Sequence, residues 1–274
     1  MPITPRQPQG IQSLEIGVRV LRAVQLAAHP LALKDVAKAS ALSPSQAHRY
    51  LTSWVRCGFI VQDPASGNYR LGEQALALGL AALHRHDTLE RAALQLTELA
   101  AALGETSVMT VWCQDGPICV RWLRGLSLLG TDAGLGTIFP VAGSAAGLVF
   151  AAYLPPSLTL PLLARQATEP MTRQVVSKKS GAAITPNQER TQEQTQEHTR
   201  FLNANRESVR ENGYALARGH FVSGLSALSA PVFDPQGEVV ATIGVIVRDA
   251  NLATRLSHYA NALVQAANKA SLII

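Results

Sequence analysis

Residues 33–71, with the sequence LKDVAKASALSPSQAHRYLTSWVRCGFIVQDPASGNYRL, decide the fold of the N-terminal part of this chain. At the start of the stretch, Leu33, Val36 and Ala37 have the i, i+3, i+4 spacing that gives a short helix one apolar face. The dipeptide Ala41-Leu42 then predicts a turn. The pattern indicates a short amphipathic helix that ends before a second helical segment.

Ser43 and Pro44 mark the start of that second helix. The Ser43 hydroxyl can cap free backbone amides, and proline at the first helical position loses an N–H that has no helical partner. The helix is predicted to run to about Arg56, and Gly58 ends it. Its apolar stripe consists of Ala47, Leu51, Trp54 and Val55.

The opposite face of the second helix carries hydrogen-bonding groups and cations, without an acidic residue. Its members are Ser45, Gln46, His48, Arg49, Thr52, Ser53 and Arg56. A helix that enters the major groove needs donors and acceptors for base edges and cations for phosphates. We therefore predict a DNA-contacting face, although His48 taken alone is as compatible with a solvated surface histidine.

A β-hairpin is predicted directly after this helix. Residues 59–61 and 69–71 are short strand candidates, and the turn-forming residues 63–68 join them. The arrangement is a helix-turn-helix with a wing, in which Arg70 lies near a phosphate. Winged helices also serve protein–protein contacts, so the hairpin by itself does not establish the partner.

The charge distribution favours DNA over a protein partner. Residues 1–85 hold 9 Lys and Arg against 4 Asp and Glu, and residues 86–274 hold 15 of each, which accounts for the whole net charge of +5. A basic segment is the electrostatic footprint of a nucleic-acid-binding domain. The N-terminal segment is therefore predicted to bind double-stranded DNA.

Several short motifs of the chain resemble the IclR-type bacterial transcriptional regulators, over residues 13 to about 270. In the N-terminal part they are Ser13-Leu14-Glu15, Val20-Leu21, Leu42-Ser43, His48-Arg49, Gly58-Phe59-Ile60, Asp63-Pro64 and residues 67–72. Further along they are Gly104-Glu105-Thr106, Asp115-Gly116, Gly125, Pro140, residues 144–147, Gly213-Tyr214-Ala215, residues 230–234 and Gly237. The resemblance implies a sequence-specific transcriptional regulator, repressor or activator, controlled by a small molecule.

The expected fold class is α+β, with two domains, since helix and strand patterns are intermixed beyond residue 94. The expected parts are a disordered tail (1–12), a winged helix-turn-helix domain (13–73), a linker helix (74–91) and an effector-binding domain (92–274) that the resemblance implies is GAF-like. An amphipathic helix is expected at 94–103. Residues 172–212 read as a long polar loop and a solvated helix, to which no chemistry is assigned.

Leucines lie on more than one side of the predicted linker helix, which suits burial against a partner domain or a second subunit. A single recognition helix covers few base pairs, so a homodimer that reads two half-sites of a palindromic operator, about 34 Å apart, is the physical expectation. The resemblance implies dimers through the N-terminal domain and often a tetramer through the effector domains.

The resemblance also implies where the effector binds. Backbone amides of Ala145 and Ala146, at the start of the helix after Pro140, would hold a carboxylate, as free N–H groups and a helix dipole favour. Ser144 would add a hydroxyl, and Arg218 or His220 would help to neutralise the acid. The body of the ligand would lie against Met109, Leu126, Leu135 and Ala227.

This sequence departs from the family pattern at positions that often carry polar side chains. Ala217 stands where an acidic residue is common, Ala227 where a cysteine is frequent, and Gly244 and Ile246 where serines often line the last strand. We expect a larger, partly hydrophobic effector, such as an aromatic or branched organic acid. The alternative is that these residues only fill a core.

An enzyme is the competing class, and the motifs argue against it. The segment 142–146 lacks a nucleophile elbow, and there is no P-loop, dinucleotide fingerprint or recognisable metal-ligand spacing, so no catalytic residue, metal or cofactor is predicted. Cys57, Cys113 and Cys119 have unrelated spacings. Buried packing is the expected role of Cys113 and Cys119; the alternative is a redox-responsive regulator or a GAF-like thiol enzyme that uses this pair.

The chain is expected to be cytoplasmic, without a membrane partner. It has no apolar run of about 18 residues, and residues 1–8 lack the apolar core of a signal peptide.

Overall fold

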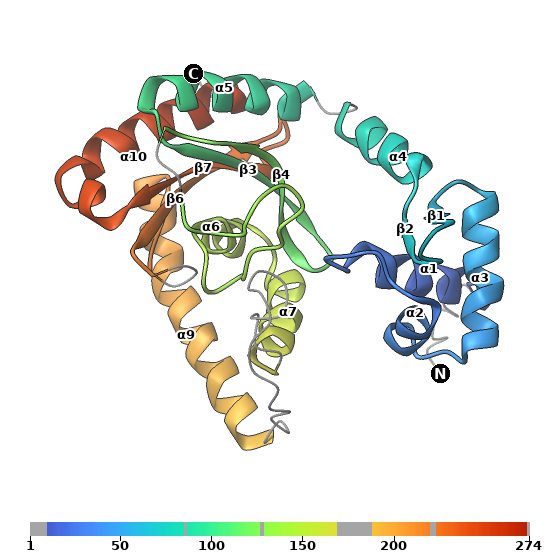
Figure 1. The fold of residues 1–274 in the computed structure, drawn as a ribbon. Coiled ribbons are helices and arrows are strands. Elements are labelled where there is room, and N and C mark those ends of the chain that lie inside the picture. The colour runs from blue at the N-terminus through green and yellow to red at the C-terminus, as the bar shows by residue number, and fades with distance from the viewer. Residues whose placement is uncertain (1–9, 85–86, 127–128, 169–187, 220–222, 273–274) are drawn as a thin grey trace, which may run out of the picture. The chain divides into compact units, whose positions relative to one another are not determined.

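The computed structural model describes residues 10–84, 87–126, 129–168, 188–219 and 223–272 (Figure 1). The chain divides into two compact units, residues 1–85 and 86–274. Each unit has its own core and is described by itself.

The N-terminal unit contains the predicted helix-turn-helix and wing. Its elements are α1 (Gln12–Gln25), α2 (Leu33–Ala39), α3 (Pro44–Arg56), α4 (Glu73–His84) and the antiparallel strands β1 (Ile60–Gln62) and β2 (Tyr69–Leu71). One hydrophobic cluster joins α1, α2, α3 and the hairpin, and its buried members are Val20, Val24, Val36, Leu51, Ile60 and Tyr69. Between α2 and α3, Ala41 adopts φ 53°, which makes the sharp turn of the motif.

The wing differs from the prediction by one residue on its first strand. Phe59 does not begin the strand, because its N–H donates to the Trp54 carbonyl at 3.0 Å and closes the end of α3. The Phe59 ring also contacts Trp54 edge-on, with ring centroids 5.4 Å apart. Leu31 adds a short bridge to Tyr69, so the hairpin is tied to the segment before α2.

The segment predicted as a linker helix, residues 74–91, includes parts of two described helices. α4 ends at His84, and α5 (Asp87–Leu103) is a separate helix that includes residues 87–91 and extends the helix expected at 94–103. The four polar residues 84–87 interrupt the apolar pattern of the segment. Asp87 and Glu90 lie in the first turn of α5, where acidic side chains favour a helix start.

The C-terminal unit is built on a five-stranded antiparallel sheet with the strand order β4-β3-β7-β6-β5. The strands are β3 (Thr106–Cys113), β4 (Gly116–Leu123), β5 (Ala215–Arg218), β6 (Leu225–Phe233) and β7 (Val239–Arg248). β3–β4 and β6–β7 are antiparallel hairpins, and β5 pairs with β6 at the edge of the sheet. β5 is short and is defined by its pairing with β6.

Helices cover both faces of this sheet (Figure 1). α5 and α10 (Asp249–Ser271) pack on one face, and α6 (Ala145–Tyr153) packs on the other. α7 (Pro156–Thr168) and α9 (Gln188–Asn212) pack against each other, and α9 also contacts α6. The unit therefore has the expected α+β architecture, with the start of α6 directed at one face of the sheet.

The polar segment 172–212 is only partly a solvated helix. Residues 169–187 lie outside the described residues, and α9 covers the remainder. Leu202 and Val209 of α9 are buried in the cluster formed with α6 and α7. The described C-terminal part of α9 thus contributes to the core of the unit.

Candidate nucleic-acid interface and ligand cavity

The start of α3 is held by a reciprocal capping box. The Gln46 N–H donates to Ser43 Oγ at 3.3 Å, and the Ser43 N–H donates to Gln46 Oε1 at 3.2 Å. The Ser43 hydroxyl also donates to Gln46 Oε1 at 3.0 Å. The side-chain oxygen of Gln46 is therefore engaged in the cap, which leaves its amide nitrogen as the group that can reach a base.

The polar face predicted for α3 is exposed along the whole helix. Ser45, Gln46, His48, Arg49, Thr52, Ser53 and Arg56 are all solvent-exposed, while Ala47 and Leu51 are buried. Within the described parts of the chain, neither Arg49 nor Arg56 forms an ion pair. Both guanidinium groups are available to phosphate oxygens.

Two hydroxyls on this face are bonded to the helix itself. Thr52 Oγ1 donates to the His48 carbonyl at 2.9 Å, and Ser53 Oγ donates to the Arg49 carbonyl at 3.2 Å. Each oxygen can still accept a hydrogen bond from outside. Val55, predicted to belong to the buried stripe, is 37% exposed, because the core of this small unit is filled by Leu51 and its neighbours.

The wing presents Arg70 on its exposed side. The loop beside it is fixed by the Asp63 carboxylate, which accepts the Ala65 N–H at 2.9 Å and the Ser66 hydroxyl at 2.7 Å. The Ser66 hydrogen bond, followed by that of Ala65, holds the pKa of Asp63 below its ordinary value. The Asp63 carboxylate therefore accepts hydrogen bonds from residues of its own loop.

In the C-terminal unit, the start of α6 has two backbone donors without partners. Ser144 caps the helix: its hydroxyl donates to the Pro140 carbonyl at 2.6 Å and accepts the Gly147 N–H at 3.0 Å. The N–H groups of Ala145 and Ala146 have no acceptor among the described residues. These residues are only 2% and 7% exposed, so water does not readily satisfy the two donors.

A small cavity of about 50 Å³ lies at this end of α6. It is bounded by the residues just before the helix, by the sheet face under it and by the loop after β4. The lining residues are Trp122, Thr131, Ala133, Phe139, Gly143, Ser144, Ala217, Gly219, Leu225, Ser226, Ala227 and Ile246. No acidic side chain is among them, so an anion in the cavity meets no like charge.

The cavity contains some of the predicted effector-binding residues. Ser144 and Ala227 line it, and Ala145 and Ala146 follow Ser144 at the helix start. Ala217 and Ile246, two positions where the sequence departs from the family pattern, also line it. These side chains add apolar surface to its wall.

Other predicted effector-binding residues lie elsewhere, which corrects the prediction. Met109 pairs with Ile243, whose side chain lies on the sheet face opposite Ile246, so Met109 belongs to the core under α5 and α10. Leu126 and Leu135 are 94% and 73% exposed. Neither leucine lines the cavity, so apolar character alone was not sufficient to predict a lining residue.

Arg218, one of the two predicted cationic partners, is not among the residues that line the cavity. Arg218 is exposed, and its neighbour Ala217 takes the inward position on β5, because side chains alternate along a strand. His220 lies outside the described residues. The predicted neutralisation of an acid by Arg218 is therefore not supported.

Sequence reasoning missed Trp122, Phe139 and Leu225 as lining residues. The signal for Trp122 is the register of two strands, since Val108 pairs with Trp122 and shares the sheet face of Ile246. That register depends on a bulge between Met109 and Thr110, which hydropathy alone does not reveal.

The alternative built on a Cys113–Cys119 pair is contradicted by the strand register. Cys119 pairs with Thr110, three residues from Cys113 along β3, a separation of roughly 10 Å along a strand. Disulfide formation needs Cα atoms within about 7 Å. Burial also raises the pKa of the Cys119 thiol to about 12, which suppresses the reactive thiolate.

The described residues contain neither a metal-ligand cluster nor a membrane-spanning helix. Among the described ranges, no group of three or more His, Cys, Asp or Glu side chains is placed to hold a metal ion. None of the helices in those ranges has the length and hydropathy that crossing a membrane requires.

Comparison with known proteins agrees with this geometry. The model of the IclR helix-turn-helix domain matches residues 13–64. The model of the bacterial transcriptional regulator IclR C-terminal domain matches residues 80–182 and 179–272. Together these matches span most of the chain and both of its units.

Individual relatives match over nearly the whole chain. The glycerol operon regulatory protein of Streptomyces griseus is 29% identical over 237 residues, which are 86% of this chain and 85% of the relative. The crystal structure of Pseudomonas aeruginosa HmgR is 30% identical with a TM-score of 0.52, covering 96% of this chain and 97% of that one.

A third relative shares the fold at lower identity. An IclR homologue from Microbacterium hydrocarbonoxydans, solved in complex with 4-hydroxybenzoate, is 20% identical with a TM-score of 0.67, and the match covers 94% of this chain and 97% of that one. The two family matches, the HmgR likeness and the helix-turn-helix geometry lead to one conclusion. The chain belongs to the IclR family of bacterial transcriptional regulators, which are DNA-binding proteins and not enzymes.

Proposed function

We propose that this regulator changes its operator affinity when a small organic acid binds at the start of α6. The observation that carries the proposal is the pair of buried, unpartnered N–H groups of Ala145 and Ala146. Free amides at a helix N-terminus, together with the positive end of the helix dipole, stabilise a carboxylate. An unsatisfied buried donor costs about 1–3 kcal/mol, which a bound carboxylate would recover.

The chemistry of the lining supports an acid with an apolar body. Beside Ser144, the cavity wall includes Ala217, Ala227 and Ile246, and the two amides follow Ser144 at the start of α6. The homologue bound to 4-hydroxybenzoate provides a precedent for an aromatic acid within this fold. A cavity of about 50 Å³ holds little more than the carboxylate head, so the body of such a ligand extends beyond it.

On the DNA side, we assign base contacts to the N-terminal half of α3 and phosphate contacts to its C-terminal half and the wing. Ser45, the Gln46 amide nitrogen, His48 and Arg49 reach base edges or adjacent phosphates. Thr52, Ser53, Arg56 and Arg70 hold the DNA backbone. Hydrogen bonds to base edges specify sequence, and cation–phosphate contacts supply salt-dependent affinity.

The regulator acts as a dimer in this proposal. Leu76 and Leu78 of α4 are 65% and 63% exposed, and Leu80 is also exposed. Three leucines on a short helix leave a large apolar area in water, which a second subunit would cover. Two subunits then present two α3 helices to the half-sites of a palindromic operator.

Effector control needs only a modest coupling energy. If the acid binds one arrangement of the effector domains better than another, it shifts their populations, and with them the spacing of the two α3 helices. A coupling of about 1–3 kcal/mol gives a 5- to 150-fold change in operator affinity. The direction of regulation depends on where the operator lies relative to the promoter.

Isothermal titration calorimetry with benzoate, 4-hydroxybenzoate and short aliphatic acids tests the effector proposal. Ala145→Pro removes one of the two donors at the first helical position, where proline is tolerated, and Ala145→Val is a control of similar bulk that keeps the N–H. We expect the proline variant to bind acids about tenfold more weakly than the valine variant. No heat and no thermal shift with any acid for the native protein would refute it.

A further inference from the structure

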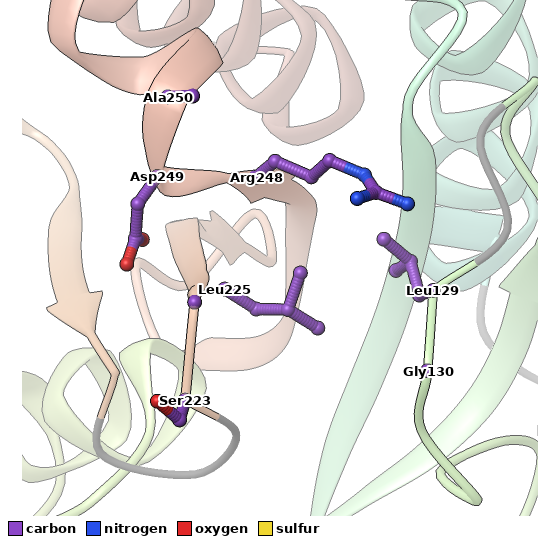
Figure 2. Close-up of a pocket in the computed structure, with 8 residues that line it drawn as sticks. Leu129, Gly130, Ser223, Leu225, Arg248, Asp249 and Ala250 are labelled. Carbon is purple, nitrogen blue, oxygen red and sulfur yellow. The ribbon is translucent and has the colours of Figure 1, made fainter.

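A second, larger hollow lies next to the cavity at α6. It has a volume of about 450 Å³, within the range of pockets that bind small organic molecules. Its lining residues come from the end of β7, the start of β6 and the loop after β4 (Figure 2). They are Leu129, Gly130, Ser223, Gly224, Leu225, Arg248, Asp249 and Ala250.

This outer pocket continues the sheet face that floors the inner cavity. Ala227 pairs with Ile246, and two residues further along Leu225 pairs with Arg248. Residues two apart on a strand point to the same side, so both pairs present their side chains to one face. Leu225 lines the inner and the outer space and therefore forms the boundary between them.

The outer pocket has apolar walls and one cation. In Figure 2 the side chains of Leu225 and Arg248 extend toward the side of the pocket that carries Leu129. The Asp249 carboxylate projects away from this side, and its Oδ1 accepts the Ser226 hydroxyl. The positive charge of Arg248 is thus the charge that faces the apolar part of the pocket.

We propose that the natural effector is an elongated organic dianion that spans both spaces. One carboxylate binds the amides of Ala145 and Ala146, the apolar middle passes Leu225, and a second anionic group binds Arg248. The inference rests on the proposed effector site, and it further specifies that the ligand is elongated and carries two negative charges. A second carboxylate placed among leucines would cost affinity without a cationic partner, and Arg248 supplies that partner.

The sizes of the two spaces support an elongated ligand. The inner cavity of about 50 Å³ is too small for an acid with a sizeable body, whereas the outer pocket of about 450 Å³ has room for one. A ligand confined to the inner cavity would leave the outer apolar walls in water. A ligand that crosses Leu225 gains their burial.

Three acids test the parts of the proposed ligand one at a time. Acetate supplies one carboxylate, octanoate adds an apolar chain, and octanedioate adds a second carboxylate. Calorimetry on the full-length native protein should show octanedioate binding about tenfold more tightly than octanoate, and acetate most weakly. Arg248→Gln should remove the preference for octanedioate and change octanoate binding less than about twofold. Arg218→Gln, an exposed cation on the neighbouring strand β5, is the matched control and should retain the preference.

A steric variant tests the path between the two spaces. Leu225→Trp should weaken both eight-carbon acids and leave acetate unchanged, whereas Leu158→Trp at an exposed position of α7 should change neither. Equal binding of octanoate and octanedioate by the native protein, or equal effects of Arg248→Gln and Arg218→Gln, would overturn the inference. Binding of acetate alone would overturn it while the proposed function stands; binding of no carboxylate would refute both.

Discussion

Arg206 of α9 donates from Nε to the carbonyl of Ala152, near the C-terminal end of α6, at 3.2 Å. Its Nη2 donates to the Leu154 carbonyl at 3.2 Å, and Arg210 Nε donates to the same Ala152 carbonyl at 3.0 Å. The last carbonyls of a helix lack intrahelical partners and carry partial negative charge. Two guanidinium groups therefore cap the helix whose other end carries the free amides.

Removing this cap should destabilise the C-terminal unit. Arg206→Gln combined with Arg210→Gln deletes three charge-assisted hydrogen bonds, and we expect a loss of roughly 2–4 kcal/mol in the free energy of unfolding. Urea denaturation measures it. Arg200→Gln, at an exposed position of the same helix, should change stability by less than about 0.5 kcal/mol. Equal free energies of unfolding for the double variant and this control would show that the two arginines do not stabilise the unit.

The capping box of α3 should support both stability and DNA binding. Ser43→Ala removes the hydroxyl that accepts the Gln46 N–H, and we expect a cost of about 1 kcal/mol in stability. Ser43→Thr keeps the acceptor and serves as the control. Thermal unfolding gives the stability, and fluorescence anisotropy gives the DNA affinity. A native-like Ser43→Ala protein in both measurements would contradict the role assigned to the cap.

The exposed leucines of α4 should hold the dimer together. Leu78→Glu places a charge in the proposed subunit contact, so sedimentation velocity should show a shift from dimer to monomer at micromolar protein. Leu158→Glu, at an exposed position of α7 in the C-terminal unit, is the control and should leave the mass unchanged. A native dimer for Leu78→Glu would place the subunit contact elsewhere.

Cys119 should be inert as long as the protein is folded. Its pKa of about 12 lies above the ordinary value of 9.0, so folded Cys119 stays protonated while an unfolded chain ionises between pH 9 and 12. Its contribution to stability is therefore full below pH 9 and is lost as the pH rises toward 12. Mass spectrometry after iodoacetamide treatment at pH 8 should find exposed Cys57 alkylated and Cys119 alkylated only after denaturation. Rapid labelling of Cys119 in the native protein would contradict this prediction and favour a reactive role for the thiol.

The DNA-binding half could be predicted because its signals are local. Ser43, Pro44 and Gly58 place the ends of α3, and the face without acidic residues follows from helical periodicity. What escaped prediction was tertiary in origin: Gln46 reads as a base contact from its type, but its oxygen is used by the cap. Hydropathy also did not separate the residues of α4 from those of α5, since leucines recur in both helices.

The ligand cavity was only half predictable. The start of α6 was expected from Pro140 and Ser144, but the walls depend on which strand residues share a face. Met109 was assigned to the pocket although its pairing with Ile243 places it on the other side of the sheet. Leu126 was assigned by hydropathy and is exposed. The two-sided burial of β3 explains the error, since apolar residues on both faces erase the alternation that would distinguish them.

Binding to the DNA upstream of the protein's own gene, measured across a salt series with nonspecific duplex as competitor, tests the central claim most directly. We expect tight, specific binding that weakens steeply with salt, and an Arg49→Ala protein that loses at least about tenfold in affinity while Arg121→Ala, an exposed cation of the other unit, binds like the native protein. If Arg49→Ala binds this DNA as the native protein does at physiological salt, α3 does not present the DNA-contacting face.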